Sequence, residues 1–139
     1  MYLSYEEYQN MGGALDETTF NDYRFEAETK IDWYTFNRLQ KDEVIPEAVK
    51  RCVFRLIKLI QDMNQASIMD GATSSDSGIS AGISSQSNDG VSISYNTISA
   101  RDMLEYSKTG IDMTIKQYLY GITNAAGKKL LYRGLYPDE

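Results

Sequence analysis

The chain has 139 residues and a formal net charge of −6 at pH 7, a length at which one domain can bury its own hydrophobic core. A net negative charge repels phosphate backbones and anionic membrane surfaces, which argues against general affinity for either. With no histidine in the chain, the Ser-His-Asp and Cys-His catalytic arrangements are excluded, and so are the commonest zinc and iron ligand sets.

Two helices are predicted in the first forty residues. Ser4 and Glu7 form a capping box that opens a short helix, which Gly12 and Gly13 would close. Asp16 then caps a longer helix ending near Gln40. Its core-facing apolar residues recur at spacings of three and four: Phe20, Tyr23, Ala27, Ile31 and Tyr34.

Two more helices are predicted further along the chain. Pro46 suits the first turn of a third helix, whose wide apolar face comprises Val49, Cys52, Val53, Leu56, Ile57, Ile60 and Met63. A fourth begins at Ser99, with Asp102 completing a looser capping box, and Gly121 can end it. Its apolar face comprises Met103, Leu104, Ile111, Ile115, Tyr118 and Leu119.

Between the last two predicted helices lies a segment rich in serine and glycine, residues 72–97. Apolar residues alternate on both sides of the turn-forming Asn88, Asp89 and Gly90, which predicts a β-hairpin. Fixing about twenty such residues costs on the order of 20 to 40 kcal/mol of backbone entropy. The segment is therefore predicted to be an arm that is mobile in the free monomer and ordered by a partner.

These elements predict an all-α protein, a small bundle of about four helices forming a single domain over residues 1–139. The hairpin arm covers residues 72–97, and a C-terminal tail covers 122–139, with one short strand from Lys129 to Arg133. No apolar run approaches the length of a membrane span, and the N-terminus does not have the pattern of a signal peptide. We therefore expect a soluble, unprocessed protein.

No catalytic, cofactor or metal site is predicted, so we do not expect an enzyme. Cys52 lies on an apolar helix face, where a buried thiol is far more common than a nucleophile, and a lone cysteine suits a reducing cytoplasm. An enzyme that acts through carboxylates and a metal is the least favoured alternative, because nothing in the sequence fixes two acids against each other.

A basic cluster on the third predicted helix allows two interpretations. Its members are Lys50, Arg51, Arg55 and Lys58. Contact with nucleic acid is one, but four cations without interleaved aromatics in an acidic chain are a weak signal. Pairing with acidic side chains on a neighbouring helix or subunit is favoured.

The chain has eleven tyrosines, a residue favoured at protein interfaces. Tyr23, Tyr34 and Tyr118 stand at core spacing and are predicted to pack inside. The interface candidates lie outside the helix stripes: Tyr2, Tyr95, Tyr132 and Tyr136.

Four segments of the chain, in order, resemble head-tail connector (adaptor) proteins of tailed bacteriophages and prophages of Gram-positive bacteria. They are "MYLSYEEYQNMGGALDETTFNDYRFEAETKIDWYTFNRL", "VIPEAVKRCVFRLIKLI", "ISSQSNDGVSISY" and "LLYRGLYPDE". The resemblance covers nearly the whole chain, although it includes no catalytic signature, and "MDGATSSDSGISAG" is an additional stretch ahead of the third segment.

The resemblance implies a structural virion protein, made in the bacterial host cytoplasm, that forms a homo-oligomeric ring at the head-tail junction. The ring docks on the portal protein, offers a surface to the next tail (stopper) protein, and extends a channel through which DNA passes without specific binding; no membrane is involved. The arm would be 83–95 and the terminal segment 130–136. The implied assembly residues are Ile83, Val91, Ile93, Tyr95, Leu131, Tyr132, Arg133 and Tyr136. The alternative function is that of a small phage regulator that binds nucleic acid through the basic cluster.

Overall fold

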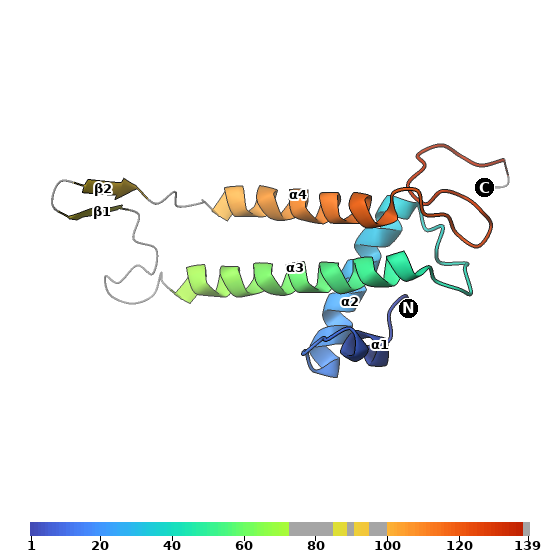
Figure 1. The fold of residues 1–139 in the computed structure, drawn as a ribbon, viewed down its shortest axis with the longest axis horizontal. Coiled ribbons are helices and arrows are strands. Elements are labelled where there is room, and N and C mark those ends of the chain that lie inside the picture. The colour runs from blue at the N-terminus through green and yellow to red at the C-terminus, as the bar shows by residue number, and fades with distance from the viewer. Residues whose placement is uncertain (73–84, 89–90, 95–99, 138–139) are drawn as a thin grey trace.

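The computed structural model describes residues 1–72, 85–88, 91–94 and 100–137. Four α-helices lie within these residues: α1 (Tyr5–Asn10), α2 (Glu17–Thr35), α3 (Glu47–Ala72) and α4 (Ala100–Leu119). The predicted helical class is therefore confirmed. Figure 1 shows α3 and α4 side by side and running in opposite directions, with α2 crossing behind them near the end where both chain termini lie.

Two short strands occupy part of the predicted hairpin. Strand β1 (Ser85–Asn88) pairs antiparallel with β2 (Val91–Ser94), and Ser85 lies opposite Ser94. Ile83 and Tyr95 lie outside the described residues, as do most of the other residues of 72–97. The arm and its mobility therefore stay a prediction.

One hydrophobic core joins the N-terminal residues, the helices and the start of the tail. Its fully buried side chains come from α2, α3 and α4, from Leu39 between α2 and α3, and from Leu3 and Leu130 at opposite ends of the chain. On α3 they form the predicted apolar face: Val49, Cys52, Val53, Leu56 and Ile57, with Ile60 almost fully buried. This shared core holds the two ends of the chain against the same set of helices.

The predicted start of α1 is confirmed in detail. The Ser4 hydroxyl accepts a hydrogen bond from the Glu7 backbone N–H at 3.2 Å, and the Glu7 carboxylate accepts one from the Ser4 N–H at 3.0 Å. After the helix, a Cβ on Gly13 would lie 2.2 Å from the Tyr8 ring. Only glycine lets the chain pass this close to the buried tyrosine.

The predicted end of α2 near Gln40 is wrong. The helix ends at Thr35, because Phe36 and Asn37 both adopt the left-handed backbone conformation, with φ of 55° and 57°. The Asn37 N–H donates to the Asp32 carbonyl at 3.0 Å, which closes the last turn. This change of direction brings Arg38 and Leu39 into the interior, where both are buried.

The predicted strand from Lys129 to Arg133 is also wrong. The tail forms a single antiparallel bridge between Thr123 and Lys129, and the Leu130 N–H donates to the Ile122 carbonyl at 3.0 Å. The predicted end of α4 is confirmed, since Gly121 follows it with a φ of 76°. The tail therefore turns back on itself and places Leu130 in the core.

Two predictions about tyrosines are also corrected. Tyr2, an interface candidate, is buried. Its hydroxyl donates to the Asp32 carboxylate, and its backbone N–H donates to the Glu28 carboxylate at 2.6 Å. Tyr118, assigned to the core, is exposed at the edge of the α4 apolar face. Tyr23 and Tyr34 pack against the core while remaining partly exposed.

Candidate functional site

A buried arginine fixes the tail to the end of α2. The Arg38 guanidinium donates hydrogen bonds to four backbone carbonyls of the tail, those of Lys129 (3.2 Å), Leu130 (3.2 Å), Tyr132 and Gly134 (2.8 Å). A planar guanidinium has several donors in a fixed arrangement and suits this role better than an ammonium group. The tail is thereby ordered without regular secondary structure.

Aromatic rings surround the same guanidinium. It lies over the ring of Phe36, 5.1 Å from the centroid, and over that of Tyr136 at 5.0 Å, both within the range of cation–π attraction. The Tyr136 hydroxyl accepts a hydrogen bond from the Lys129 N–H at 2.8 Å, and its ring lies 5.2 Å from that of Tyr132. Tyr136, predicted as an interface residue, therefore has a structural role, whereas Tyr132 remains exposed.

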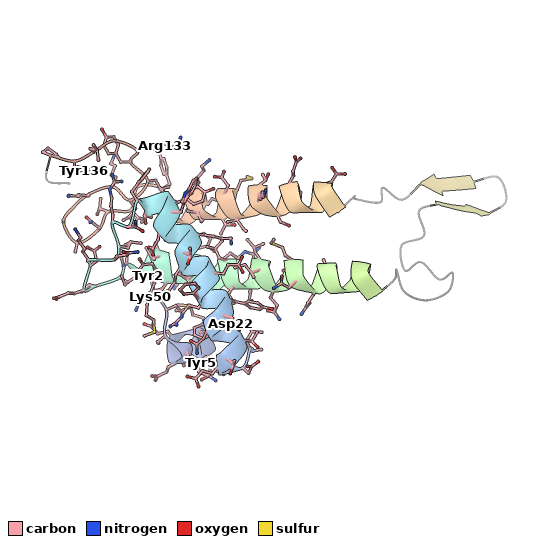
Figure 2. All side chains as sticks on the ribbon, turned by 180° about the vertical axis from the view of Figure 1, so that it is seen from behind. Tyr2, Tyr5, Asp22, Lys50, Arg133 and Tyr136 are labelled. Atoms are coloured by element: carbon pink, nitrogen blue, oxygen red, sulfur yellow. The ribbon has the colours of Figure 1, made fainter. Side chains whose placement is uncertain are left out.

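An open groove of about 600 Å³ lies where the end of α2, the end of α4 and the tail meet. We call it the aromatic groove. It is lined by Asp32, Trp33, Tyr34, Phe36, Asn37, Lys116, Leu131 and Arg133. Figure 2 shows Arg133 and Tyr136 together at this end of the molecule, beside the end of α2. Trp33 is 75% exposed and Phe36 is 51% exposed, so large apolar surfaces here face solvent.

One wall of the groove is fixed by a hydrogen bond between α2 and α4 and by a second bond within α4. The Tyr34 hydroxyl donates to the Asp112 carboxylate at 2.7 Å, and Lys116 donates to the same carboxylate at 2.7 Å. Burial raises the pKa of Tyr34 to about 12, and the nearby Asp112 carboxylate adds to the shift. The bonds from Lys116 and then from Tyr34 lower the pKa of Asp112. At neutral pH the tyrosine is therefore a protonated donor and the aspartate an ionised acceptor.

Replacing Tyr34 with phenylalanine should lower the free energy of unfolding by about 1 kcal/mol at pH 7, the contribution typical of one such hydrogen bond. The Asp112 pKa should rise towards its ordinary value, because one of its two donors is lost. A lowered carboxyl pKa contributes stability above the unfolded-state value, and that contribution is lost as pH falls through the folded-state pKa. The difference between wild type and variant should therefore shrink below about pH 4. Thermal unfolding across pH and an NMR titration of the Asp112 carboxyl would measure both effects; an unchanged Asp112 pKa would contradict them.

The side chains that line this groove are suited to binding a partner. Exposed tryptophan and phenylalanine beside an arginine match the composition enriched in protein interfaces. Cys52 lies elsewhere, in the core, where burial raises the pKa of its thiol to about 12 and keeps it protonated. Over the described part of the chain, no three acidic or cysteine side chains are grouped as metal ligands.

The basic cluster on α3 is partly used in ion pairs. Lys50 pairs with Glu7 of α1, so the predicted pairing with a neighbouring helix is confirmed for Lys50, and this bond lowers the pKa of Glu7. Arg51 pairs with Glu47 of its own helix at 3.2 Å. Lys58 lies 4.9 Å from the centroid of the Phe54 ring.

The structure brings only some of the predicted assembly residues together. Leu131 and Arg133 line the aromatic groove, with Tyr132 and Tyr136 around Arg38 beside it. Val91 and Ile93 belong to β2, but their side chains lie outside the described part of the structure. Sequence reasoning missed Trp33, Phe36 and Arg38. The sequence does contain a signal for Trp33: it is a large apolar residue that lies outside the Phe20-to-Ile31 stripe, the side of this helix that faces the core.

Comparisons with protein-family models, with curated proteins and with solved structures find no match to this chain. No helix within the described ranges is both long enough and apolar enough to cross a membrane.

Proposed function

We propose that this chain is a structural assembly protein that forms a closed ring at the junction between a phage head and tail. In this role it docks on the portal, extends the DNA channel and presents a surface to the next tail component. The observation that carries the proposal is the aromatic groove, which exposes Trp33 and Phe36 on a support held rigid by Arg38. The ordered resemblance to connector proteins supplies the identity of the assembly.

The groove has the physical properties of a site for a protein partner. Burying one large apolar side chain contributes about 1.5 to 3 kcal/mol, so covering Trp33 and Phe36 gives a substantial driving force for association. The groove walls are already fixed, because Arg38 donates hydrogen bonds to the tail and Tyr34 donates one to Asp112. The walls therefore have little conformational entropy left to lose on binding. Arg133 in the lining suits a partner surface that is acidic, and the chain itself is acidic.

The hairpin arm is the second part of this proposal. In it, residues 72–97 dock on a neighbouring subunit or on the portal. The strand β2 offers main-chain groups for pairing with another chain, a mode in which backbone hydrogen bonds supply the affinity. Few ionised side chains occur in the segment, so little desolvation opposes docking. The net negative charge of the protein would let DNA slide through the ring without adhering.

Native mass spectrometry of the purified full chain across a concentration series tests ring formation. We expect one large oligomer of fixed stoichiometry, and Trp33→Asp should shift it to monomer, because a charge on this exposed side chain would be desolvated in the interface. Asn64→Asp is the matched control: it adds the same charge at an exposed position of α3, outside the groove, and should leave the oligomer intact. A wild-type chain that is monomeric at every concentration contradicts ring formation by the chain alone.

A gel-shift at physiological salt separates this proposal from a nucleic-acid regulator. No appreciable DNA affinity is expected, since the chain is acidic overall and two of the four clustered cations are already paired. A shift that Arg55→Glu abolishes would favour the regulator.

A further inference from the structure

Helix α4 has apolar side chains on two opposite sides. Ile111, Ile115 and Leu119 point into the core. On the other side Tyr106 and Met113 are 79% and 60% exposed, and Tyr120, directly after the helix end at Leu119, is 86% exposed; its N–H still donates to the Lys116 carbonyl at 3.0 Å, which continues the helical turn. These three recur every seven residues, almost two full turns, so they form one line along the helix. We call this line, together with Gly110 and Gln117 between its members, the α4 outer face.

Within the described parts of the molecule, no contact explains why residue 110 of α4 is a glycine. Glycine inside a helix is less favourable than alanine by about 1 kcal/mol, so a structural reason is expected. Yet a Cβ placed on Gly110 would have nothing within 4 Å. Small residues on an exposed helix face allow another chain to approach closely. Nearby, the Thr109 hydroxyl donates to the Glu105 carbonyl at 2.9 Å, which satisfies it within its own helix.

Helix α2 also has an uncovered side. Phe20, Ala27 and Ile31 are fully buried, whereas Phe25, like Trp33, is largely exposed, at 72%. Thr29 lies between these two aromatics, and its hydroxyl donates to the Phe25 carbonyl at 2.8 Å, so this hydroxyl is paired within its own helix. Phe25, Thr29 and Trp33 make up the α2 outer face, which runs into the aromatic groove at Trp33.

We infer that the α4 outer face of one copy of this chain packs against the α2 outer face of the next copy, an inference that rests on the proposed ring. A cyclic ring of more than two subunits needs two different, complementary patches on each subunit, whereas a two-fold dimer needs only one. The described part of this chain exposes two such apolar faces, on different helices. Each lies opposite the core-facing side of its own helix.

The two faces match in spacing and size. Phe25 and Trp33 are eight residues apart, about 12 Å along the helix, and successive large side chains on the α4 outer face are seven residues apart, about 10.5 Å. An aromatic ring of α2 therefore fits the hollow above Gly110, between Tyr106 and Met113. Aromatic side chains bury roughly 150 to 250 Å² each, so Tyr106 and Tyr120 supply about half of the roughly 800 Å² per partner in a standard interface.

Gly110→Ala tests the close approach, because its effects on the monomer and on the ring should have opposite signs. The added methyl should raise the melting temperature of the monomer by a few degrees, since it favours the helix and meets open space. It should also weaken the association between copies at least tenfold, because the methyl group would occupy the space above Gly110 that the proposed interface gives to an aromatic ring of the next copy. Thr114→Ala is the control, because it also favours the helix but lies off the α4 outer face; it should leave assembly unchanged.

Cross-linking tests which faces meet. Thr29→Cys and Gln117→Cys add one thiol to each outer face and keep every apolar side chain, while the only native cysteine, Cys52, is buried and unreactive. A short bismaleimide should link the two variants when they are mixed and should link neither variant with itself. A cross-link between two copies of the same variant would mean that the same face of both copies meets at the interface. That result would overturn the head-to-tail arrangement.

The failure of this interface can be told apart from the failure of the ring. A wild-type ring that tolerates Gly110→Ala and gives no mixed cross-link overturns the interface and leaves the proposed function standing. A wild-type chain that remains monomeric overturns ring formation by the chain alone, and the interface with it. Loss of assembly in Gly110→Ala together with the mixed cross-link supports both.

Discussion

Arg38→Ala should lower the free energy of unfolding by about 3 to 5 kcal/mol. The buried guanidinium satisfies four carbonyls of the tail, and hydrogen bonds to a charged group contribute about 1.5 to 3 kcal/mol each but are not additive. The loss also removes the contacts with the Phe36 and Tyr136 rings. Urea unfolding would give the change in free energy, and hydrogen exchange should show that protection of the tail from 128 to 136 is lost first.

Arg38→Lys is the informative control for this prediction. Lysine keeps the positive charge, but it has no planar group that can reach several carbonyls at once and stack between two rings. We therefore expect about half of the alanine effect. A loss below about 1 kcal/mol for Arg38→Ala would mean that the tail is held by Leu130 and its neighbours in the core, and that the arginine contributes little.

The same substitution connects stability with the candidate site. Leu131 and Arg133 line the aromatic groove, and both belong to the stretch whose carbonyls Arg38 holds. Without the arginine, these residues should no longer keep their places beside Trp33. Assembly should then be weakened even under conditions in which the helices remain folded, which circular dichroism would verify in the same samples.

The helices could be predicted because their signals are local. The capping box of Ser4 and Glu7, the cap at Asp16 and the proline before α3 each act within one helical turn. The apolar spacing of three and four then identifies the face of each helix that packs in the core. All these signals are contained in about twenty consecutive residues, so no knowledge of the tertiary structure is needed to read them.

The end of α2 and the role of Arg38 could not be predicted in this way. Phe36 and Asn37 adopt left-handed conformations without a glycine to signal them. The carbonyls that Arg38 reaches lie 91 to 96 residues further along the chain. The burial of Tyr2 likewise depends on acids 26 and 30 residues away. Such long-range partners leave no periodic pattern in the sequence.

Trp33 and the α2 outer face show a different limit. A search for one apolar stripe finds the core-facing side of α2 and stops there, so apolar residues on the opposite side pass unnoticed. Phe25 and Trp33 are visible in the sequence, but their exposure becomes clear only when the position of α3 against α2 is known. The residues of the candidate interface can therefore be read from the sequence, but only the fold shows that they are exposed.

The aromatic cluster between α1 and α2 shows what the buried side of α2 does. The Phe20 ring lies 4.6 Å from that of Tyr8 and 5.3 Å from that of Tyr5, measured between centroids. Arg24 lies above the same ring at 5.7 Å. Because α1 is only six residues long and has no stability of its own, it is attached to the protein by these contacts, by the Lys50–Glu7 ion pair and by the Tyr8 ring, which lies 5.6 Å from that of Phe54.

Phe20→Ala should therefore cost about 3 to 5 kcal/mol, the range for removing a fully buried phenylalanine, and should detach α1. Phe25→Ala, on the same helix five residues later, should change the stability of the monomer by no more than about 0.5 kcal/mol, because the side chain is exposed. Urea unfolding of both variants measures this contrast. Equal losses would mean that Phe25 packs within its own chain. A large loss for Phe20 alone, accompanied by weaker assembly for Phe25, would show that the two sides of α2 serve different purposes: one holds the fold together and the other holds the neighbouring copy.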